Sequence, residues 1–350
     1  FFFVIPTVSA HAAGRTLPFA TALRTNVSAN PLGVQVADFN GDGNLDAAFA
    51  SASANTVVVM IGDGNGGFGA PSSYVVGDIY SDVAEHNVLA VGDYDGDGDT
   101  DIVTTSYAAK TLSFLLNDGT GQFAPASSQT IPGIAGGGSY SITSADINND
   151  GRSEVVVCKY FQAGLTVIAR DNSGNLTVLT ENSGLGYTYS ATPADLTGDG
   201  VDDVLGGARN GARTFSNVAS GTFGQVNTYP SSLGTVYGVA AGDLNGDGND
   251  DAVITEGSTV ASALGTGTGA LDAWSTATTS GHSVSVSLSD LNGDGFLDAA
   301  VGNKDPYSNT VSANLGNGDG TFETDTSFVV GASSNATPSS VATGDMNNDG

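Results

Sequence analysis

The sequence has very little cysteine and very little positive charge. Cys158 is the single cysteine among 350 residues, so the chain can form no internal disulfide and no cysteine-based metal cluster. We expect it to be a small buried side chain on a strand. Nine Lys and Arg stand against 37 Asp and Glu, and the formal net charge is −28. Because nucleic-acid binding requires a basic surface, nucleic acid is not an expected partner.

Long apolar runs are also missing. The N-terminal stretch "FFFVIPTVSAHAAG" is too short to span a bilayer, and no later segment is a better candidate, so we expect no transmembrane segment. Its apolar run is followed by Ala10-His11-Ala12, a small-x-small pattern that precedes signal-peptidase cleavage. We interpret residues 1–13 as the remnant of an export signal and predict a secreted or cell-surface protein. An apolar strand of the first or last structural unit is the alternative.

Helix-favouring runs are scarce, and the chain contains 50 glycines. Short alternations such as "TVVVMIG" and "SVSVSL" are instead typical of β-strands. The composition therefore predicts an all-β protein.

One acidic motif is abundant, because seven copies of it occur along the chain. The first copy is "DFNGDGNLD", and 24 of the 37 Asp and Glu residues lie inside the copies. Successive first aspartates are separated by 55, 53, 49, 48, 47 and 55 residues, a period typical of a propeller or solenoid. The copies begin at Asp38, Asp93, Asp146, Asp195, Asp243, Asp290 and Asp345.

Each period contains four short apolar stretches, which is the content of one propeller blade. One stretch precedes the acidic motif, a second follows it, a third ends in a glycine-rich turn, and a fourth comes after that turn. The turn is followed by Phe68, Phe123, Phe223 or Phe322, with Leu176 and Leu271 in two degenerate copies. Hydrophobic volume is thus what this position requires, and we expect the side chain to pack between neighbouring blades.

With both the acidic motif and the Gly-Phe turn, the chain resembles the FG-GAP/VCBS repeats that also form the integrin α-subunit propeller. The resemblance covers residues 14–350 and implies one domain, a seven-bladed β-propeller of four-stranded antiparallel blades. The last blade is expected to be incomplete, because the seventh copy supplies only its first strand, "SSVATGDM". Residues 16–25 are a candidate outer strand for it. We predict that the natural protein continues beyond Gly350.

Oxygen ligands recur at fixed positions of the nine-residue motif, which predicts metal binding. Positions 1, 3, 5 and 9 carry oxygen side chains, position 6 is always Gly, and the variable position 7 is expected to act through its backbone carbonyl. The predicted metal residues are Asp38, Asn40, Asp42, Asn44, Asp46, Asp93, Asp95, Asp97, Asp99, Asp101, Asp146, Asn148, Asp150, Arg152, Glu154, Asp195, Thr197, Asp199, Val201, Asp203, Asp243, Asn245, Asp247, Asn249, Asp251, Asp290, Asn292, Asp294, Phe296, Asp298, Asp345, Asn347 and Asp349.

Calcium is the expected ion, because it accepts six to eight oxygen ligands with flexible geometry, whereas zinc prefers nitrogen or sulfur. We expect about six to seven sites with a structural role. A metal-free turn stabilised by Asx side chains is the alternative, particularly in the third copy, which has Glu154 at position 9, and in the fourth, which has Thr197 at position 3.

Aromatic and basic residues gather in the loops that should lie on the face opposite the acidic motifs. Rings and cations there suit the binding of sugars or of a protein ligand, although lysines and tyrosines also occur in ordinary solvated loops. The candidate ligand-binding residues are His86, Tyr107, Lys110, Tyr140, Lys159, Tyr160, Tyr189, Arg209, Tyr237, His282, Lys304 and Tyr307.

The sequence therefore predicts an exported, calcium-stabilised binding or adhesion module with a carbohydrate or extracellular protein ligand. A polysaccharide lyase or hydrolase is a second hypothesis, but no catalytic triad, paired-carboxylate cleft or zinc signature stands apart from the repeats. A structural spacer within a longer surface protein is the third.

Overall fold

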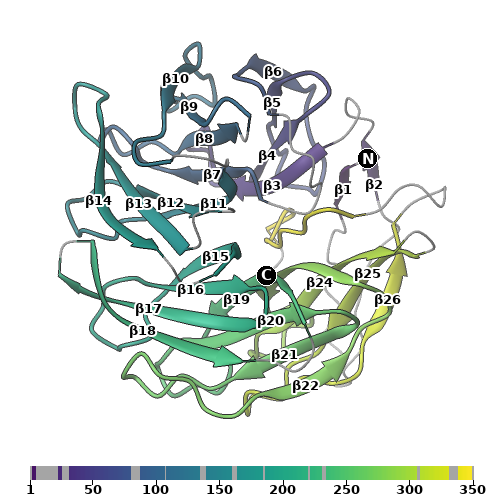
Figure 1. The fold of residues 1–350 in the computed structure, drawn as a ribbon. Coiled ribbons are helices and arrows are strands. Elements are labelled where there is room, and N and C mark those ends of the chain that lie inside the picture. The colour runs from purple at the N-terminus through teal and green to yellow at the C-terminus, as the bar shows by residue number, and fades with distance from the viewer. Residues whose placement is uncertain are drawn as a thin grey trace.

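The computed structural model describes residues 2–4, 23–25, 31–79, 87–106, 108–134, 139–159, 164–183, 186–219, 221–230, 234–305, 308–330 and 338–348. Within these ranges the strands form six four-stranded antiparallel sheets and one two-stranded pair. Figure 1 shows the six sheets arranged as blades around a common centre. The expected all-β class and the four-stranded blades are thus confirmed.

Each blade is a simple meander in which consecutive strands pair. Blade one has β3 (Pro31–Ala37), β4 (Asp46–Ser51), β5 (Thr56–Met60) and β6 (Ser72–Val75). Blade two has β7 (Leu89–Gly92), β8 (Asp101–Ser106), β9 (Thr111–Leu115) and β10 (Ser127–Thr130). Blade three has β11 (Ser139–Ala145), β12 (Glu154–Lys159), β13 (Gly164–Arg170) and β14 (Leu176–Ser183).

The remaining three blades follow the same order. Blade four has β15 (Thr188–Ala194), β16 (Asp203–Ala208), β17 (Gly211–Ala219) and β18 (Thr222–Pro230). Blade five has β19 (Val236–Gly242), β20 (Asp251–Glu256), β21 (Thr259–Ala263) and β22 (Ser275–Thr278). Blade six has β23 (Ser283–Ser289), β24 (Asp298–Asp305), β25 (Ser308–Asn314) and β26 (Thr326–Val329).

The hydrophobic core lies between neighbouring blades. The second strands of blades one to five are buried along their whole length, as expected for a strand covered on both faces. Phe123 after the third strand of blade two packs edge-on against Phe39 and Tyr74 of blade one, with ring centroids 5.6 and 5.3 Å away. Leu271 packs among residues of blades four and five. The expected position of these side chains between blades is therefore confirmed, and Cys158 is buried on β12 as expected.

The expectation of seven blades is wrong, because the ring contains six. The seventh acidic motif begins at Asp345, and residues 338–348 contain no strand. They lie between blade six and blade one, where Thr343 bonds to Ser287 on β23 and Ser340 accepts a hydrogen bond from the Val34 N–H on β3. Each acidic motif marks one loop before a second strand, so the number of motifs gives the number of these loops and not the number of sheets. A blade also needs the three strands that follow the motif.

The N-terminal residues that the structure describes form a small separate pair. β1 (Phe2–Val4) runs antiparallel to β2 (Leu23–Thr25). Figure 1 shows this pair in the sector between the first and sixth blades. The interpretation of residues 1–13 as an export-signal remnant stays a prediction. The described part of the chain contains no apolar helix of membrane-spanning length.

Candidate functional site

Each acidic motif forms the loop between the first and second strands of a blade, and its first aspartate organises that loop. The Asp38 carboxylate accepts hydrogen bonds from the N–H groups of Gly41 and Gly43, both at 2.8 Å. The same pattern is built around Asp93, Asp195, Asp243 and Asp290. Because the blades share one topology, all these loops lie on the same face of the ring.

The residue at position 7 takes the same backbone geometry whatever its side chain is. Its N–H donates to the position 5 carboxylate at 2.8–3.0 Å in copies as different as Asn44, Val201 and Phe296. The glycine at position 6 has a positive φ, for example +92° at Gly98, which few other residues adopt. The side chains at positions 1 and 5 are therefore held by the backbone of the loop.

Carboxylate oxygens come closest together in the second loop. One carboxylate oxygen from each of Asp93, Asp95 and Asp101 lies within 4.8 Å of the other two. Asp95 Oδ1 is buried and has no hydrogen-bond partner, and the same holds for Asn148 Oδ1 at position 3 of the third loop. Burial raises the pKa of Asp95, and the neighbouring carboxylates of Asp97 and Asp93 raise it further. A nearby positive charge would stabilise the ionised form of such a carboxyl group.

The acid at position 9 of the motif makes structural hydrogen bonds that the sequence did not indicate. Asp101 is fully buried, and its carboxylate accepts one hydrogen bond from the Tyr94 N–H at 3.0 Å and another from the Asn117 N–H at 2.7 Å. It thereby joins the acidic loop to the turn after the third strand. Asp46, Asp203, Asp251 and Asp298 bond in the same way.

Burial of these position 9 acids opposes their ionisation. Burial raises the pKa of Asp101 to about 7 and the pKa values of Asp203 and Asp298 to about 6. The hydrogen bonds that these carboxylates accept lower the same pKa values, but by less. Glu154 in the third loop also has a pKa of about 7 because of burial, and it bonds to the Asn148 N–H. The longer Glu side chain therefore still reaches the loop backbone.

In five of the seven copies, the residue at position 2 links its loop to the next blade, which sequence reasoning also missed. Its side chain is apolar or aromatic in every copy, so only its packing was evident from the sequence. Its carbonyl accepts a hydrogen bond from a residue at or near the end of the third strand of the following blade. These pairs are Asn117 Nδ2 to Phe39 O at 2.7 Å, Arg170 Nη1 to Tyr94 O at 3.3 Å, Asn217 Nδ2 to Ile147 O at 2.6 Å, Gly269 N to Leu196 O at 2.8 Å and Gly66 N to Met346 O at 3.0 Å.

The seventh loop takes the same place relative to blade one, as the Met346 contact shows. Asn348 also donates to Asn44 in the first loop at 2.6 Å. The predicted ligands Asp345 and Asn347 lie in this segment, and Asp349 falls outside the described residues. Residues 338–348 thus fill the sector between blades six and one although they form no sheet there.

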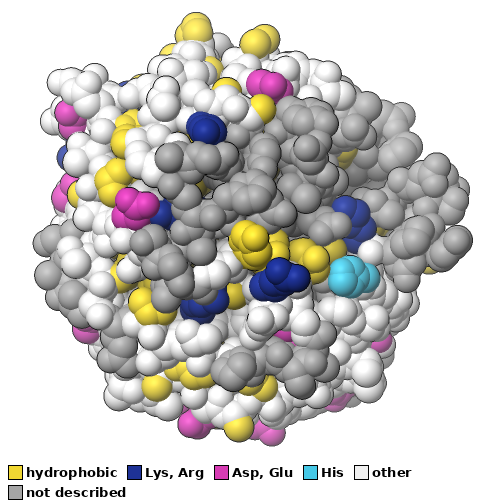
Figure 2. All heavy atoms as spheres, in the orientation of Figure 1, with side chains coloured by type: hydrophobic (Ala, Val, Ile, Leu, Met, Phe, Trp, Pro, Cys, Tyr) yellow, Lys and Arg dark blue, Asp and Glu magenta, His cyan; other side chains and the backbone are white. Residues whose placement is uncertain are grey.

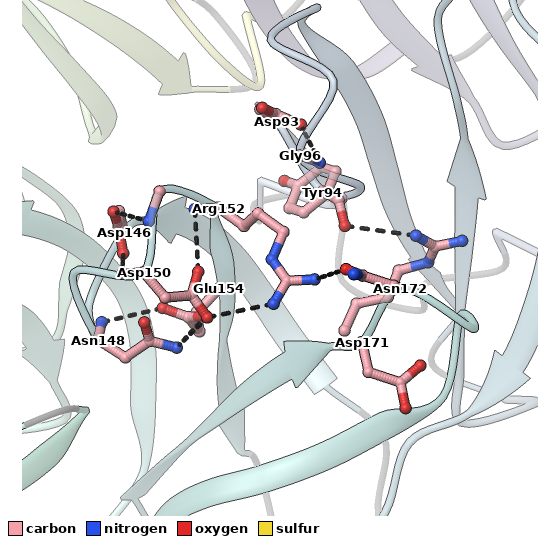
Figure 3. Close-up of polar contacts among 12 residues, drawn as sticks. Asp93, Tyr94, Gly96, Asp146, Asn148, Asp150, Arg152, Glu154, Asp171 and Asn172 are labelled. Carbon is pink, nitrogen blue, oxygen red and sulfur yellow. Dashed lines mark hydrogen bonds and ion pairs between the residues drawn. The ribbon is translucent and has the colours of Figure 1, made fainter.

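The third loop carries a cation of its own. Arg152 at position 7 forms an ion pair with Asp150 at 3.4 Å and a hydrogen bond with Asn172, as Figure 3 shows. Asn172 belongs to the turn after β13, so Arg152 joins the two loops of blade three. The positive guanidinium offsets part of the loop charge, which distinguishes this copy from the others.

Aromatic side chains form a continuous row on the opposite face. The centroids of the Tyr187 and Tyr189 rings are 6.2 Å apart, those of Tyr189 and Tyr237 are 5.6 Å apart, and those of Tyr237 and His282 are 5.6 Å apart. We call these four residues the aromatic row. It runs from blade four through blade five to the start of blade six, and brings together the predicted Tyr189, Tyr237 and His282.

Irregularities in the innermost strands position this row. The pairing register shifts between Thr188 and Ser190 on β15 and between Val236 and Gly238 on β19, so Tyr189 and Tyr237 are each the extra residue. A β-bulge redirects the side chain of its extra residue. The equivalent residue is Val284 on β23 of blade six and Gly33 on β3 of blade one, and neither is aromatic.

Basic side chains surround the middle of this face, and few acidic ones are present there (Figure 2). The Lys304 N–H donates to the His282 carbonyl at 2.7 Å, and Arg209 lies in the exposed turn between β16 and β17. Lys110 lies in the turn before β9. Lys159 is buried on β12 and forms an ion pair with Glu181 at 2.7 Å.

Some predicted ligand-binding residues cannot be placed relative to the row. His86, Tyr107, Tyr160 and Tyr307 lie outside the described residues, and Tyr140 is described only by its backbone on β11.

Comparison with known families now identifies the repeat. The model of the FG-GAP-like repeat matches residues 38–104, 93–157, 195–254, 243–301 and 290–350. The chain belongs to this family. In this FG-GAP-like repeat protein, residues 158–194 fall outside the matched ranges, and this segment includes the degenerate turn before Leu176. No curated protein sequence matches the chain.

Solved structures share the fold at low sequence identity. A lectin from Agrocybe aegerita, described by its specific recognition of non-reducing terminal N-acetylglucosamine, is 21% identical with a TM-score of 0.58, and the match covers 85% of this chain and 80% of the lectin. A protein of unknown function from Desulfotomaculum acetoxidans is 13% identical with a TM-score of 0.61, and the match covers 94% of this chain and 95% of that protein.

Proposed function

We propose that this FG-GAP-like repeat protein is an exported binding module that holds a carbohydrate on the aromatic row. The continuous contact of Tyr187, Tyr189, Tyr237 and His282 is the observation that carries the proposal. Aromatic faces pack against the C–H groups of sugar rings. The fold shared with a lectin is consistent with this role but transfers no ligand, because one fold hosts many functions.

The acidic loops are proposed to hold calcium as a structural ion. Side chains at positions 1, 3, 5 and 9 would supply the oxygen ligands, and the carbonyl at position 7 would add another. The buried Asp95 Oδ1 without a partner, and the raised pKa values of the position 9 acids, fit a cation at these loops. Calcium there would neutralise the carboxylates and stabilise the hairpins that join the blades.

A glycan array tests the carbohydrate proposal directly. The full chain is applied with and without calcium, beside Tyr189→Ala and Tyr237→Ala. We expect the wild type to bind a defined set of glycans and each variant to lose at least about tenfold in affinity, because a stacked ring is a typical binding hot spot. Val329→Ala is the control, since Val329 is an exposed apolar residue on β26, the outermost strand of blade six. Absence of wild-type binding, or binding that both tyrosine variants retain, would contradict the proposal.

A further inference from the structure

Arg213 is a half-buried cation whose donors lack partners. It lies on β17, and its Nε and Nη1 atoms are buried without a hydrogen-bond partner. Burial lowers the pKa of the guanidinium, and no acidic side chain acts against that shift. Leaving buried donors of a charged group unsatisfied is costly. In a chain with 37 Asp and Glu residues, an unpaired buried arginine therefore suggests that the partner is a ligand.

Two more polar groups without partners belong to the same interface between blades three and four. Thr188 is fully buried on β15, and its hydroxyl has no partner. The Asn182 amide nitrogen on β14 is also buried and has none. Each of these groups can donate a hydrogen bond, as Arg213 can, so the cluster suits an anion.

The geometry around Gly206 brings Arg213 and Thr188 near each other. Gly206 pairs directly with Arg213 across β16 and β17, and a Cβ at Gly206 would lie 3.3 Å from the Thr188 methyl group. Asn182 lies opposite Leu165 on the neighbouring strand, and Leu165 packs against residues of blade four. Alternation along a strand therefore places Asn182 on the side of blade three that faces Arg213.

The cluster adjoins the aromatic row. The Arg213 Nη2 atom lies 3.2 Å from the position that a Cβ of Gly186 would occupy, and Gly186 directly precedes Tyr187. Thr188 lies between Tyr187 and Tyr189 in the sequence. A ligand stacked on these two rings could therefore extend a charged group toward Arg213.

We propose that Arg213, with Thr188 and Asn182, binds the carboxylate of an acidic sugar whose ring lies on Tyr187 and Tyr189. This inference rests on the proposed carbohydrate binding and narrows it to uronate-type saccharides. A carboxylate accepts charge-assisted hydrogen bonds from several donors at once, and the Arg213 guanidinium, the Thr188 hydroxyl and the Asn182 amide each have a donor without a partner.

Calorimetric titration of the full chain tests the assignment. The probes are methyl glucuronide, methyl glucoside and glucose 6-sulfate at matched ionic strength, with sodium acetate to measure binding of the carboxylate alone. We expect methyl glucuronide to bind at least about tenfold more tightly than methyl glucoside, because a hydrogen bond to a charged group contributes that much or more. Arg213→Met should abolish this difference, whereas Asp272→Asn, at an exposed position after the third strand of blade five, should retain it.

Thermal unfolding provides a readout that does not depend on binding. We expect Arg213→Met to keep or raise the melting temperature without ligand, because the variant removes an unpaired buried charge. Saturating methyl glucuronide should raise the melting temperature of the wild type but not that of the variant.

The outcomes separate the two proposals. Equal binding of glucuronide and glucoside, or preferential binding of the sulfate, would overturn the carboxylate assignment and leave carbohydrate binding standing. Absence of all saccharide binding in the titrations and on the array would overturn both. Binding of acetate alone would overturn the assignment to a sugar.

Discussion

At the scale of single residues, the acid at position 9 has a structural role that the motif alone does not indicate. Spacing within the motif was enough to predict Asp101 as a metal ligand. Its hydrogen bonds to Tyr94 and Asn117 depend on a turn that comes after the third strand, and nothing local to the motif indicates them. The same limit applies to Lys159, which was expected in a ligand-binding loop and is instead paired with Glu181 from β14.

We expect Asp101→Asn to destabilise the protein even without metal. The asparagine has one oxygen, so its NH₂ group would face one of the two buried N–H donors. Leaving a buried donor unsatisfied typically costs about 1–3 kcal/mol in the free energy of unfolding. The measurement is chemical denaturation in excess chelator, with Asp272→Asn at an exposed site as control. Equal stability of wild type and Asp101→Asn would show that the bonds to Tyr94 and Asn117 contribute little.

At the scale of structural elements, the order of strands within a blade was predictable, but the bulges were not. Apolar stretches on each side of the acidic motif, and the Gly-Phe turn, follow from local residue preferences and were confirmed. A bulge is a property of pairing between two strands, so the sequence showed Tyr189 and Tyr237 without showing that both are extra residues in their ladders. The contact between their rings follows from this shared irregularity.

The acidic loop depends on the left-handed backbone at position 6. Gly98 has φ of +92°, and a Cβ there would meet no atom within 4 Å. We therefore expect Gly98→Ala to lower the free energy of unfolding by about 1–2 kcal/mol through backbone strain alone. Gly69→Ala is the control, because Gly69 is exposed, has no positive φ and would make an ordinary contact. Denaturant titration of both variants gives the comparison, and equal stabilities would contradict the strain argument.

At the scale of the whole molecule, the propeller was predictable from the repeat period, whereas the number of blades was not. Seven acidic motifs are present, but residues 338–348, where the last one begins, form no strand, and the described strands form six four-stranded sheets. The hydrogen bonds between blades also escaped prediction, because the position 2 carbonyl that accepts them belongs to the backbone and has no sequence signature.

Calcium removal should affect the whole ring, if the acidic loops hold the ion as proposed. A site filled at 100 times its Kd stabilises the folded state by about 2.7 kcal/mol, and several sites add up. We expect the melting temperature to fall strongly in excess chelator and to recover with calcium more than with magnesium at equal concentration. Differential scanning calorimetry measures this directly, and a melting curve unchanged by chelator would refute the structural role of calcium.

The junction between blades six and one, which residues 338–348 form, is expected to be the least stable part of the ring. Every other junction joins two complete sheets, whereas here a strand-free stretch contacts β23 and β3 through bonds that involve Ser287, Thr343, Ser340 and Val34. Residues 338–348 form no strand ladder, whereas each of the six blades is held together by three ladders. Thermal opening should therefore start there, and the propeller should unfold from one defined seam instead of losing its blades at random.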